Sequence, residues 1–115
     1  MLYNVGMDVY SALADPTRRN IMELLAARGQ LRAGEIYKQF PVNPPAISQH
    51  LHVLREANLV TMQKHAQERL YALNPAPMQE LELWVQKLTE QWNSQFDRLD
   101  DLLEREKIKS RKRRK

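Results

Sequence analysis

The sequence of 115 residues contains no cysteine, which excludes disulfide bonds and thiolate chemistry and is compatible with a reducing cytosol. It also lacks an apolar run long enough to span a bilayer, and its first ten residues lack the long apolar stretch of a signal peptide. We therefore expect one cytoplasmic domain with no membrane partner. The hydrophobic share of 43% is enough for a modest buried core.

Catalytic groupings are missing as well. The chain shows no Ser/His/acid set, no cluster of metal ligands and no glycine-rich phosphate loop. We therefore expect neither an enzyme nor a bound cofactor.

The basic residues are unevenly distributed. The formal net charge of +4 divides into +2 for residues 1–77, −5 for residues 78–106 and +7 for residues 107–115. The high isoelectric point therefore comes from the last nine residues and is a poor argument for nucleic-acid binding by itself. We expect this basic tail to be disordered. It either adds non-specific affinity for nucleic acid, lies back on the acidic segment, or is foreign to the natural chain.

Residues 43–57 have the pattern of one helix. Asn43 is a suitable N-cap, Pro44 fits the first helical position, and Asn58 can take the left-handed conformation that ends a helix. Three apolar residues recur at helical spacing and predict a buried face: Ile47, Leu51 and Leu54.

The opposite face of this helix is short, polar and able to form hydrogen bonds. At 100° per residue it carries Pro45, Gln49, His52 and Glu56, with Ser48 on its edge. Two interpretations remain open: the face enters the major groove of DNA, or it is the solvated face of an ordinary helix.

Two helices are predicted upstream of this segment. Residues 7–14 form a short helix, and residues 16–28 form a second one that is capped by Asp15, begun by Pro16 and ended by Gly29. Inward-facing residues of the two helices are Val9, Leu13 and, less clearly, Tyr10, followed by Ile21, Leu24 and Leu25.

Arg18 and Arg19 fall in the first turn of the second helix, where the helix dipole does not favour cations. Either an external anion such as phosphate or a local acid such as Asp15 offsets the unfavourable interaction of these cations with the helix dipole.

Residues 33–40 predict a third short helix, with Pro41 and Val42 as a tight connection to Asn43. Its packing candidates are Ile36, Tyr37 and Phe40. Two short helices joined by about three residues, the second with a polar outer face, form the helix-turn-helix pattern.

Two stretches rich in β-forming residues, 59–63 and 69–73, predict a β-hairpin around a polar turn at residues 64–68. A hairpin directly after a helix-turn-helix makes a winged helix, so we predict a mainly α (α+β) fold with a two-stranded wing. Lys64, His65 and Arg69 would then lie near phosphates or the minor groove. The alternative is a solvated hairpin tip.

Residues 78–106 predict a helix of about 43 Å with an acidic polar face. Its apolar residues recur every three or four positions and are Leu81, Trp84, Val85, Leu88, Trp92, Phe96, Leu99, Leu102 and Leu103. One small domain cannot cover so long a stripe, so we expect it to pack on the same helix of a second subunit, assisted by Val9 and Leu13. A cofactor box around the two tryptophans is the alternative. Residues 1–106 would thus form one domain that includes both dimerisation helices.

Three motifs in this order resemble the arsenic-repressor (ArsR) family of bacterial winged-helix regulators: LADPTRRNIMELL, AISQHLHVLREANLV and RLYALN. The match spans residues 8–74. The resemblance implies a homodimeric transcriptional repressor of its own or a neighbouring operon, bound to an inverted-repeat operator in double-stranded DNA. The C-terminal pattern, with two tryptophans before FDRLDDLLE, resembles a subgroup encoded beside START-like ligand-binding proteins.

The sequence departs from the metal-sensing members of that family. Many of them use a Cys-x-Cys where this chain has residues 31–35, and others use histidine on the C-terminal helix, where residues 78–106 contain none. His50 and His52 lie about 200° apart on one helix and cannot chelate one ion together. We therefore predict no metal site, and the inducer, if one exists, is an unidentified small molecule or protein. The wing also lacks the glycine often found at its tip.

Each predicted DNA-binding residue has a role that follows from its chemistry. Gln49 is the best base reader because its amide can pair with adenine N6 and N7, which is worth about 1–3 kcal/mol of discrimination. Ser48 and His52 can bond a base or a phosphate, and Pro45 can touch a thymine methyl or a sugar. His50 lies on the apolar shoulder, where a structural role and a DNA contact both remain open. Phosphate binding would fall to the cations Arg18, Arg19, Lys38, Arg55, Lys64 and Arg69, because two prolines remove N–H donors from the helix start.

Two other functions stay open at this point. A winged-helix protein-interaction module would use the long helix for a partner and leave the face of residues 43–57 idle. A sequence-indifferent architectural protein would bind DNA mainly through its basic tail. Retardation of promoter DNA at physiological salt, with random DNA as competitor, separates these functions from a specific regulator.

Overall fold

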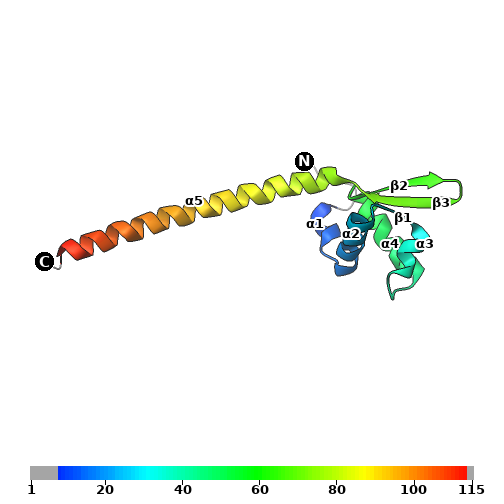
Figure 1. The fold of residues 1–115 in the computed structure, drawn as a ribbon, viewed down its shortest axis with the longest axis horizontal. Helices are drawn as coiled ribbons and strands as arrows, with labels where there is room; N and C mark the ends of the chain where they lie inside the picture. Colours follow the sequence, from blue (N-terminus) through cyan, green and yellow to red (C-terminus); the bar gives the residue numbers. More distant parts are fainter. Residues whose placement is uncertain (1–7, 114–115) are drawn as a thin grey trace. The chain divides into compact units, whose positions relative to one another are not determined.

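The computed structural model describes the backbone of residues 8–113 and the side chains of residues 8–110 (Figure 1). Met7, where the first helix was predicted to begin, and residues 114–115 of the tail lie outside the described residues. The elements in chain order are α1 (Val9–Leu13), α2 (Pro16–Arg28), β1 (Gln30–Arg32), α3 (Ala33–Lys38), α4 (Pro44–Glu56), β2 (Val60–His65), β3 (Glu68–Leu73) and α5 (Pro75–Arg113). The chain divides into two compact units between Gln79 and Glu80.

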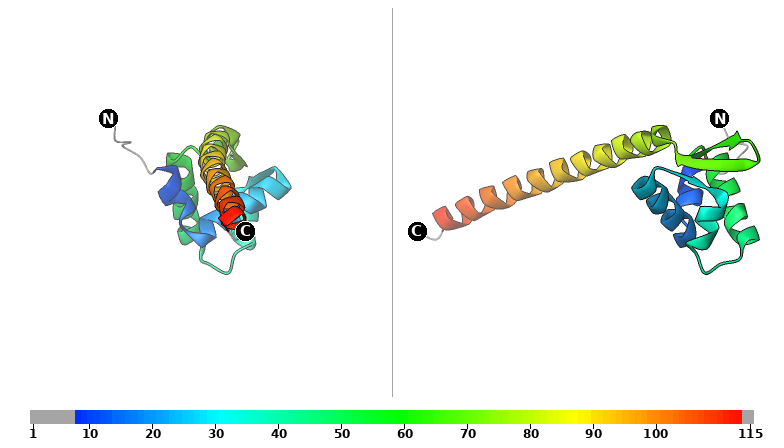
Figure 2. Two further views of the ribbon diagram at one scale, coloured as in Figure 1. Left: turned by 90° about the vertical axis from the view of Figure 1, so that its left-hand side faces the viewer. Right: turned by 45° about the vertical axis from the view of Figure 1, so that its right-hand side comes forward.

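The N-terminal unit consists of four helices on one side of a small antiparallel sheet (Figures 1 and 2). The strand order is β1-β3-β2, with β3 paired to both neighbours. The buried side chains of its core come from every helix of this unit and from the sheet. The largest of those that are fully buried are Ile21, Leu25, Ile36, Ile47, Leu51, Leu54 and Leu59. These findings confirm the predicted mainly helical winged-helix fold.

The third strand, β1, was missed by the sequence analysis. Its three residues pair with Leu70–Ala72 of β3, and only Leu31 is buried. A three-residue strand is too short to show the alternation of polar and apolar residues that identifies strands in a sequence. The predicted two-stranded wing is therefore a three-stranded sheet.

Helix α4 begins and ends where the sequence predicts. The side chain of Asn43 accepts a hydrogen bond from the backbone N–H of Ala46 at 2.9 Å, and Pro44 occupies the first turn. Asn58 has φ 61°, the left-handed conformation that terminates the helix. The three residues of its predicted buried face are all fully buried, as expected: Ile47, Leu51 and Leu54.

Helix α3 is shorter than predicted and ends at Lys38 instead of residue 40. Phe40 precedes Pro41, and a residue before proline is disfavoured in helical conformation. The N–H groups of Gln39 and Phe40 instead close a tighter turn on the carbonyls of Ile36 and Tyr37. The connection to α4 is accordingly residues 39–43, longer than the predicted three residues.

In α1 the inward-facing set differs from the prediction at one position. Val9 and Leu13 are partly buried against the core, but Tyr10 is 59% exposed and Ala12 is fully buried in its place. Residues 9, 12 and 13 share one face of a helix, whereas residue 10 is turned about 100° from residue 9.

Helix α2 confirms its predicted boundaries, with Asp15 as N-cap and Gly29 in a positive-φ conformation after its last residue. The carboxylate of Asp15 accepts a hydrogen bond from the backbone N–H of Arg18 at 3.0 Å. That N–H holds the pKa of Asp15 below its ordinary value of 3.8; partial burial opposes this effect, and the charge of Arg18, and of His50 when its ring is protonated, adds to it.

Replacing Asp15 with alanine should lower the free energy of unfolding by about 1 kcal/mol at neutral pH, because the N-terminal N–H groups of α2 lose an acceptor. A carboxylate with a lowered pKa stabilises the folded chain above its unfolded pKa, and this stabilisation is lost as the pH falls through the folded value. The difference between the two proteins in urea unfolding should therefore shrink below pH 3.8. Asp15→Asn, which keeps the cap, is the control, and an equal loss in both variants would contradict the capping role.

Helix α5 spans 39 residues, from Pro75 to Arg113, and is longer than predicted at both ends. At its start, the side chain of Asn74 accepts a hydrogen bond from the N–H of Ala76 at 3.4 Å. At its end, residues 107–113 continue the helix, which corrects the predicted disorder of this part of the tail. Lysine and arginine are good helix formers, and Lys107 lies 3.7 Å from Glu104 one turn earlier.

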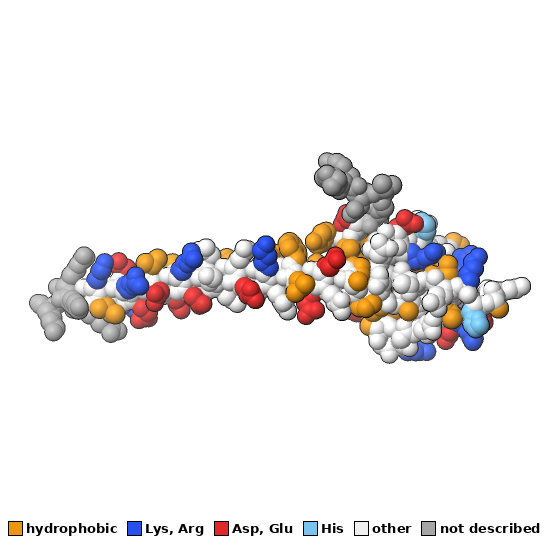
Figure 3. Space-filling model, turned by 90° about the horizontal axis from the view of Figure 1, so that it is seen from above, with side chains coloured by type: hydrophobic (Ala, Val, Ile, Leu, Met, Phe, Trp, Pro, Cys, Tyr) orange, Lys and Arg blue, Asp and Glu red, His pale blue; other side chains and the backbone are white. Residues whose placement is uncertain are grey.

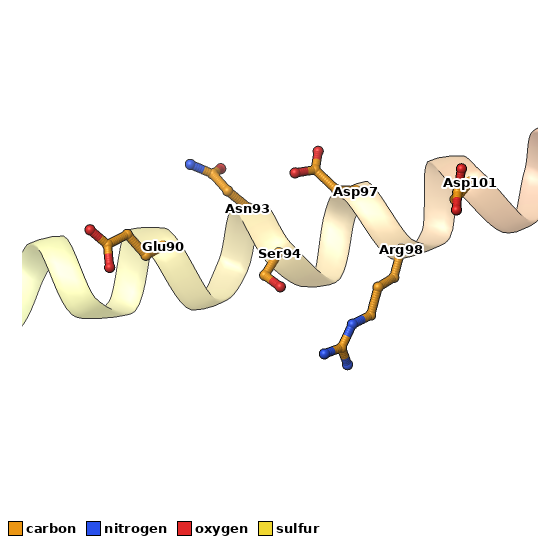
Figure 4. Close-up of a pocket in the computed structure, with 6 residues that line it drawn as sticks. All are labelled: Glu90, Asn93, Ser94, Asp97, Arg98 and Asp101. Atoms are coloured by element: carbon orange, nitrogen blue, oxygen red, sulfur yellow. The ribbon is translucent and has the colours of Figure 1, made fainter.

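The large apolar side chains of α5 are exposed except for Leu81, which is partly buried, and hydrophobic side chains recur along the helix in Figure 3. An open depression on its polar side is lined by Glu90, Asn93, Ser94, Asp97, Arg98 and Asp101 (Figure 4). In that view Asn93 and Asp97 point to one side of the helix and Arg98 to the opposite side. Such a depression cannot enclose a ligand. None of the helices in the described part of the chain has the length and apolarity to span a membrane.

Candidate nucleic-acid interface

Helix α4 presents the predicted polar face to solvent. Pro45, Gln49 and His52 are exposed on it, and Ser48 is partly buried at its edge. The fourth residue of the face, Glu56, pairs with His52 one turn earlier, with 3.7 Å between Nε2 and Oε1. The face therefore carries one amide, one imidazole and one hydroxyl that can reach base edges or phosphates.

The fold holds this face in a fixed orientation. Helix α4 packs on α2, α3 and β2, and its buried residues belong to the same core as Ile21, Ile36 and Leu59. A rigid element that presents hydrogen-bonding side chains is what reading of base edges requires, because the donor and acceptor positions must match the groove.

The hairpin is tighter than predicted. Strands β2 and β3 run into the segment predicted as a five-residue turn, so that only Ala66 and Gln67 remain between the paired residues His65 and Glu68. Ala66 has φ 59°, which supplies the positive φ that a two-residue hairpin turn needs in the absence of glycine.

This register places Lys64 directly opposite Arg69. Like charges directly opposite each other destabilise an antiparallel pair, so this pair of cations does not stabilise the hairpin. Lys64 lies two positions after Met62 and Arg69 lies two positions before Tyr71, so all four side chains are on the same side of the sheet. Met62 and Tyr71 pack into or against the core on that side, and Lys64 and Arg69 lie beyond it. His65, which was predicted to act with them, points to the other side.

Replacing Lys64 and Arg69 together with glutamine should weaken binding to all DNA sequences alike and reduce the salt slope of binding by about two for each subunit. The hairpin itself should not lose stability, since a like-charge pair is removed. Salt titrations of fluorescence anisotropy with specific and random duplexes measure the slope. Lys87→Gln on α5 is the matched control, and an unchanged slope in the double variant would exclude the wing from DNA contact.

The wing and α3 share a surface. An open groove between them is lined by Arg32, Tyr37, Lys38, Glu68 and Arg69, among other residues. Lys38 and Arg69 thus line the same groove. Arg32, which the sequence analysis did not single out, bridges the two elements through an ion pair of 3.0 Å with Glu68. The residue that could have pointed to Arg32 in the sequence is Glu35, three positions later. Its side chain accepts a hydrogen bond from the N–H of Arg32 at the start of α3.

Arg18 and Arg19 have partners that neither sequence interpretation included. The guanidinium of Arg18 donates to the carbonyls of Ala12 at 2.7 Å and Ser11 at 3.2 Å. That of Arg19 donates to the carbonyls of Leu13 at 2.7 Å and Ala14 at 3.1 Å. The last four carbonyls of a helix lack intrahelical partners, and a helix C-terminus favours cations. The end of α1 therefore explains two arginines in the first turn of α2.

The described residues thus place three groups of predicted DNA-binding residues on the N-terminal unit. The polar face of α4 is exposed, and so are the two wing cations, Lys64 and Arg69, and Arg55 near the end of α4. The two arginines of α2 are engaged with α1, and His50 is partly buried beside them. A capped helix with an exposed polar face, preceded by a short helix and followed by a cationic hairpin, defines a winged helix-turn-helix DNA-binding protein.

Comparison with known proteins gives the family. The family described as "Bacterial regulatory protein, arsR family" matches residues 15–62. The chain is 36% identical to the transcriptional repressor SdpR of Bacillus subtilis over 68% of this chain and 86% of that protein. It is 42% identical to the HTH-type transcriptional regulator Rv2034 of Mycobacterium tuberculosis over 70% of this chain and 78% of that protein.

Solved structures agree with the sequence relatives. An ArsR-like transcriptional regulator from Rhodococcus sp. RHA1 superposes with a TM-score of 0.74 at 26% identity, covering 84% of this chain and 87% of that one. The chain belongs to the ArsR family of bacterial transcriptional regulators. It is a DNA-binding regulator rather than an enzyme.

Proposed function

We propose that this regulator is a homodimeric repressor of its own or a neighbouring operon, and that it binds an inverted-repeat operator through two copies of α4. The observation that carries the proposal is the division of α4 into two faces. Ile47, Leu51 and Leu54 are fully buried, while the hydrogen-bonding residues Gln49 and His52 opposite them are exposed. Repression in particular is supported by the relative SdpR, which is itself named a transcriptional repressor.

The exposed apolar side of α5 supports the dimer. We call this side the α5 stripe; it consists of Leu81, Val85, Leu88, Trp92, Phe96, Leu99, Leu102 and Leu103, with Trp84 at its margin. These positions fall within about 120° of the helix circumference, the width of a buried helix face. Trp92 is 70% exposed and Phe96 is 55% exposed, and a contiguous apolar surface of this kind marks an association site.

Two identical subunits related by a two-fold axis would set the two α4 helices in successive major grooves. The half-sites should then lie about 34–36 Å apart along the duplex, which predicts an approximately palindromic operator. Val9 and Leu13 of α1, both partly buried in the described unit, would add to the interface. The protein would act on the nucleoid in the cytoplasm.

We propose that this regulator responds to its inducer without thiolate metal ligands, because the chain has no cysteine. Within residues 8–113 no three His, Asp or Glu side chains gather as a metal site would require. A small molecule or a protein partner is the proposed class of inducer.

The test combines sedimentation velocity with fluorescence anisotropy on duplexes that tile the DNA upstream of the gene, at physiological salt. We expect a dimer that binds one duplex far more tightly than random DNA. A protein that remains monomeric with and without DNA would overturn the dimer. Equal affinity for every duplex would instead indicate an architectural DNA-binding protein, and no binding at all would favour a protein-interaction module.

A further inference from the structure

A hydrogen-bonded cluster joins three helices of the N-terminal unit at one point. Arg18 of α2 lies at its centre: Nε donates to Ala12 O, Nη2 donates to Ser11 O, and Nη1 lies 3.3 Å from Nδ1 of His50 on α4. Asp15 at the start of α2 lies on the other side of the imidazole, with 3.8 Å between its Oδ2 and Nδ1. One guanidinium therefore ties the end of α1 and the middle of α4 to the start of α2.

A hydrogen bond from Arg18 to His50 requires one form of the imidazole. A guanidinium has only donors and stays charged, so Nδ1 must accept and the ring must be neutral, with its proton on Nε2. A protonated ring would carry a hydrogen on Nδ1 that points at Arg18, and its favourable partner would be Asp15 instead. The arrangement with Arg18 bonded to α1 and α4 together thus exists only with neutral His50.

Among the described residues, two charged groups are in contact range of His50. From α2 the groups that face His50 are Asp15 and Arg18. From α1 the carbonyls of Ser11 and Ala12 reach the cluster through Arg18. On α4 the residues one turn away from His50 are Ala46, Ile47, Val53 and Leu54, which are all uncharged.

We propose that Arg18 and His50 are positioning residues that set the rotation of α4 about its axis, and that they do not bind DNA themselves. His50 is one residue from Gln49, and its side chain is only 22% exposed, on the buried shoulder of the helix. A change in how it is held would therefore turn the polar face as a unit. The inference rests on the proposed reading of DNA by α4.

Protonation gives a readout whose sign separates positioning from contact. A histidine bound to phosphate gains affinity when it becomes charged. A histidine that holds α4 through an accepting Nδ1 loses its bond to Arg18 on protonation, so operator affinity should be lower at acidic pH than at neutral pH.

The experiment exploits the small number of histidines in the chain. His52→Gln and His65→Gln together leave His50 as the only histidine of the three. In this background we expect operator affinity, measured by anisotropy between pH 7.5 and 5.5, to fall by about tenfold or more. Adding His50→Asn, whose Oδ1 replaces the accepting Nδ1, should keep the high-pH affinity and flatten the profile. His50→Ala should show the low affinity at every pH.

A second pair of variants tests Arg18. Lysine keeps the charge but cannot donate from a planar fork to two carbonyls and an imidazole. If Arg18 positions α4, then Arg18→Lys and Arg18→Gln should lose similar affinity with an unchanged salt slope. If it binds phosphate, Lys should retain most of the affinity and Gln should lower the slope. Urea unfolding of each variant at about pH 7.5 and about pH 5.5 shows whether any loss of affinity is due to unfolding of the protein.

The outcomes are distinguishable. Affinity that rises or stays level as His50 becomes protonated, or His50→Asn that behaves like His50→Ala, overturns the positioning role while leaving DNA reading by α4 intact. If the unmodified protein binds no duplex at any pH, the proposed function and this inference are overturned together.

Discussion

Replacing Gln49 with alanine should weaken binding to the specific operator by about 1–3 kcal/mol for each half-site, while affinity for random DNA stays nearly unchanged. At each half-site this is about a 5- to 150-fold loss, and a dimer loses it twice. The physical reason is that the amide of Gln49 is exposed at the centre of the α4 face and can form two hydrogen bonds to one base. Phosphate contacts carry no sequence information, so they retain the non-specific affinity.

The measurement is a pair of anisotropy titrations, with operator and random duplexes, at one fixed salt concentration. Gln86→Ala, an exposed glutamine on the polar side of α5, is the matched control and should change neither affinity. Equal losses on both duplexes would show that Gln49 does not read bases. Restoration of affinity by one altered base pair would identify the position that it reads.

Leu88→Ala should dissociate the dimer, whereas Leu83→Ala should not. Both leucines are exposed on the same helix, 44% and 66% respectively, but Leu88 lies in the α5 stripe and Leu83 lies on the opposite side. Removing a leucine side chain from a packed interface costs about 2–5 kcal/mol, and a two-fold interface contains the residue twice. Trp92→Ala should have at least as large an effect.

Sedimentation velocity across a concentration series measures the change in dimer dissociation constant, and operator titrations measure its consequence. Operator affinity should fall with dimerisation, because a single subunit reads one half-site only. The helical content of the dilute variants, followed by circular dichroism, shows whether α5 persists without its partner. A Leu88→Ala protein that stays dimeric at the same concentrations as Leu83→Ala would exclude the α5 stripe as the dimer interface.

The boundaries of α2 and α4 could be predicted because the signals are local. Asn43 and Asp15 cap the helices that follow them, and Gly29 and Asn58 end those helices with positive φ. Each of these residues acts on backbone groups within four positions of itself, so neighbouring letters are sufficient evidence.

Other features depended on residues far apart in the chain. Strand β1 exists because Leu31 pairs with Tyr71, and the wing cations face each other because the hairpin closes on Ala66 and Gln67. The end of α5 shows a different limit: a basic composition suggested disorder, but the helix continues to Arg113 once it has been nucleated upstream.

By itself the sequence determined the order of the helices, the polar face of α4 and the apolar stripe of α5, because periodicity and capping are properties of a single segment. The tertiary structure alone decided which groups Arg18, Arg19 and His50 contact. Their side chains are long enough to reach several partners, and the choice between a phosphate and a protein group depends on which elements pack beside them. The end of α1 lies within reach of both arginines, and α4 brings His50 to Arg18 across 32 positions of sequence.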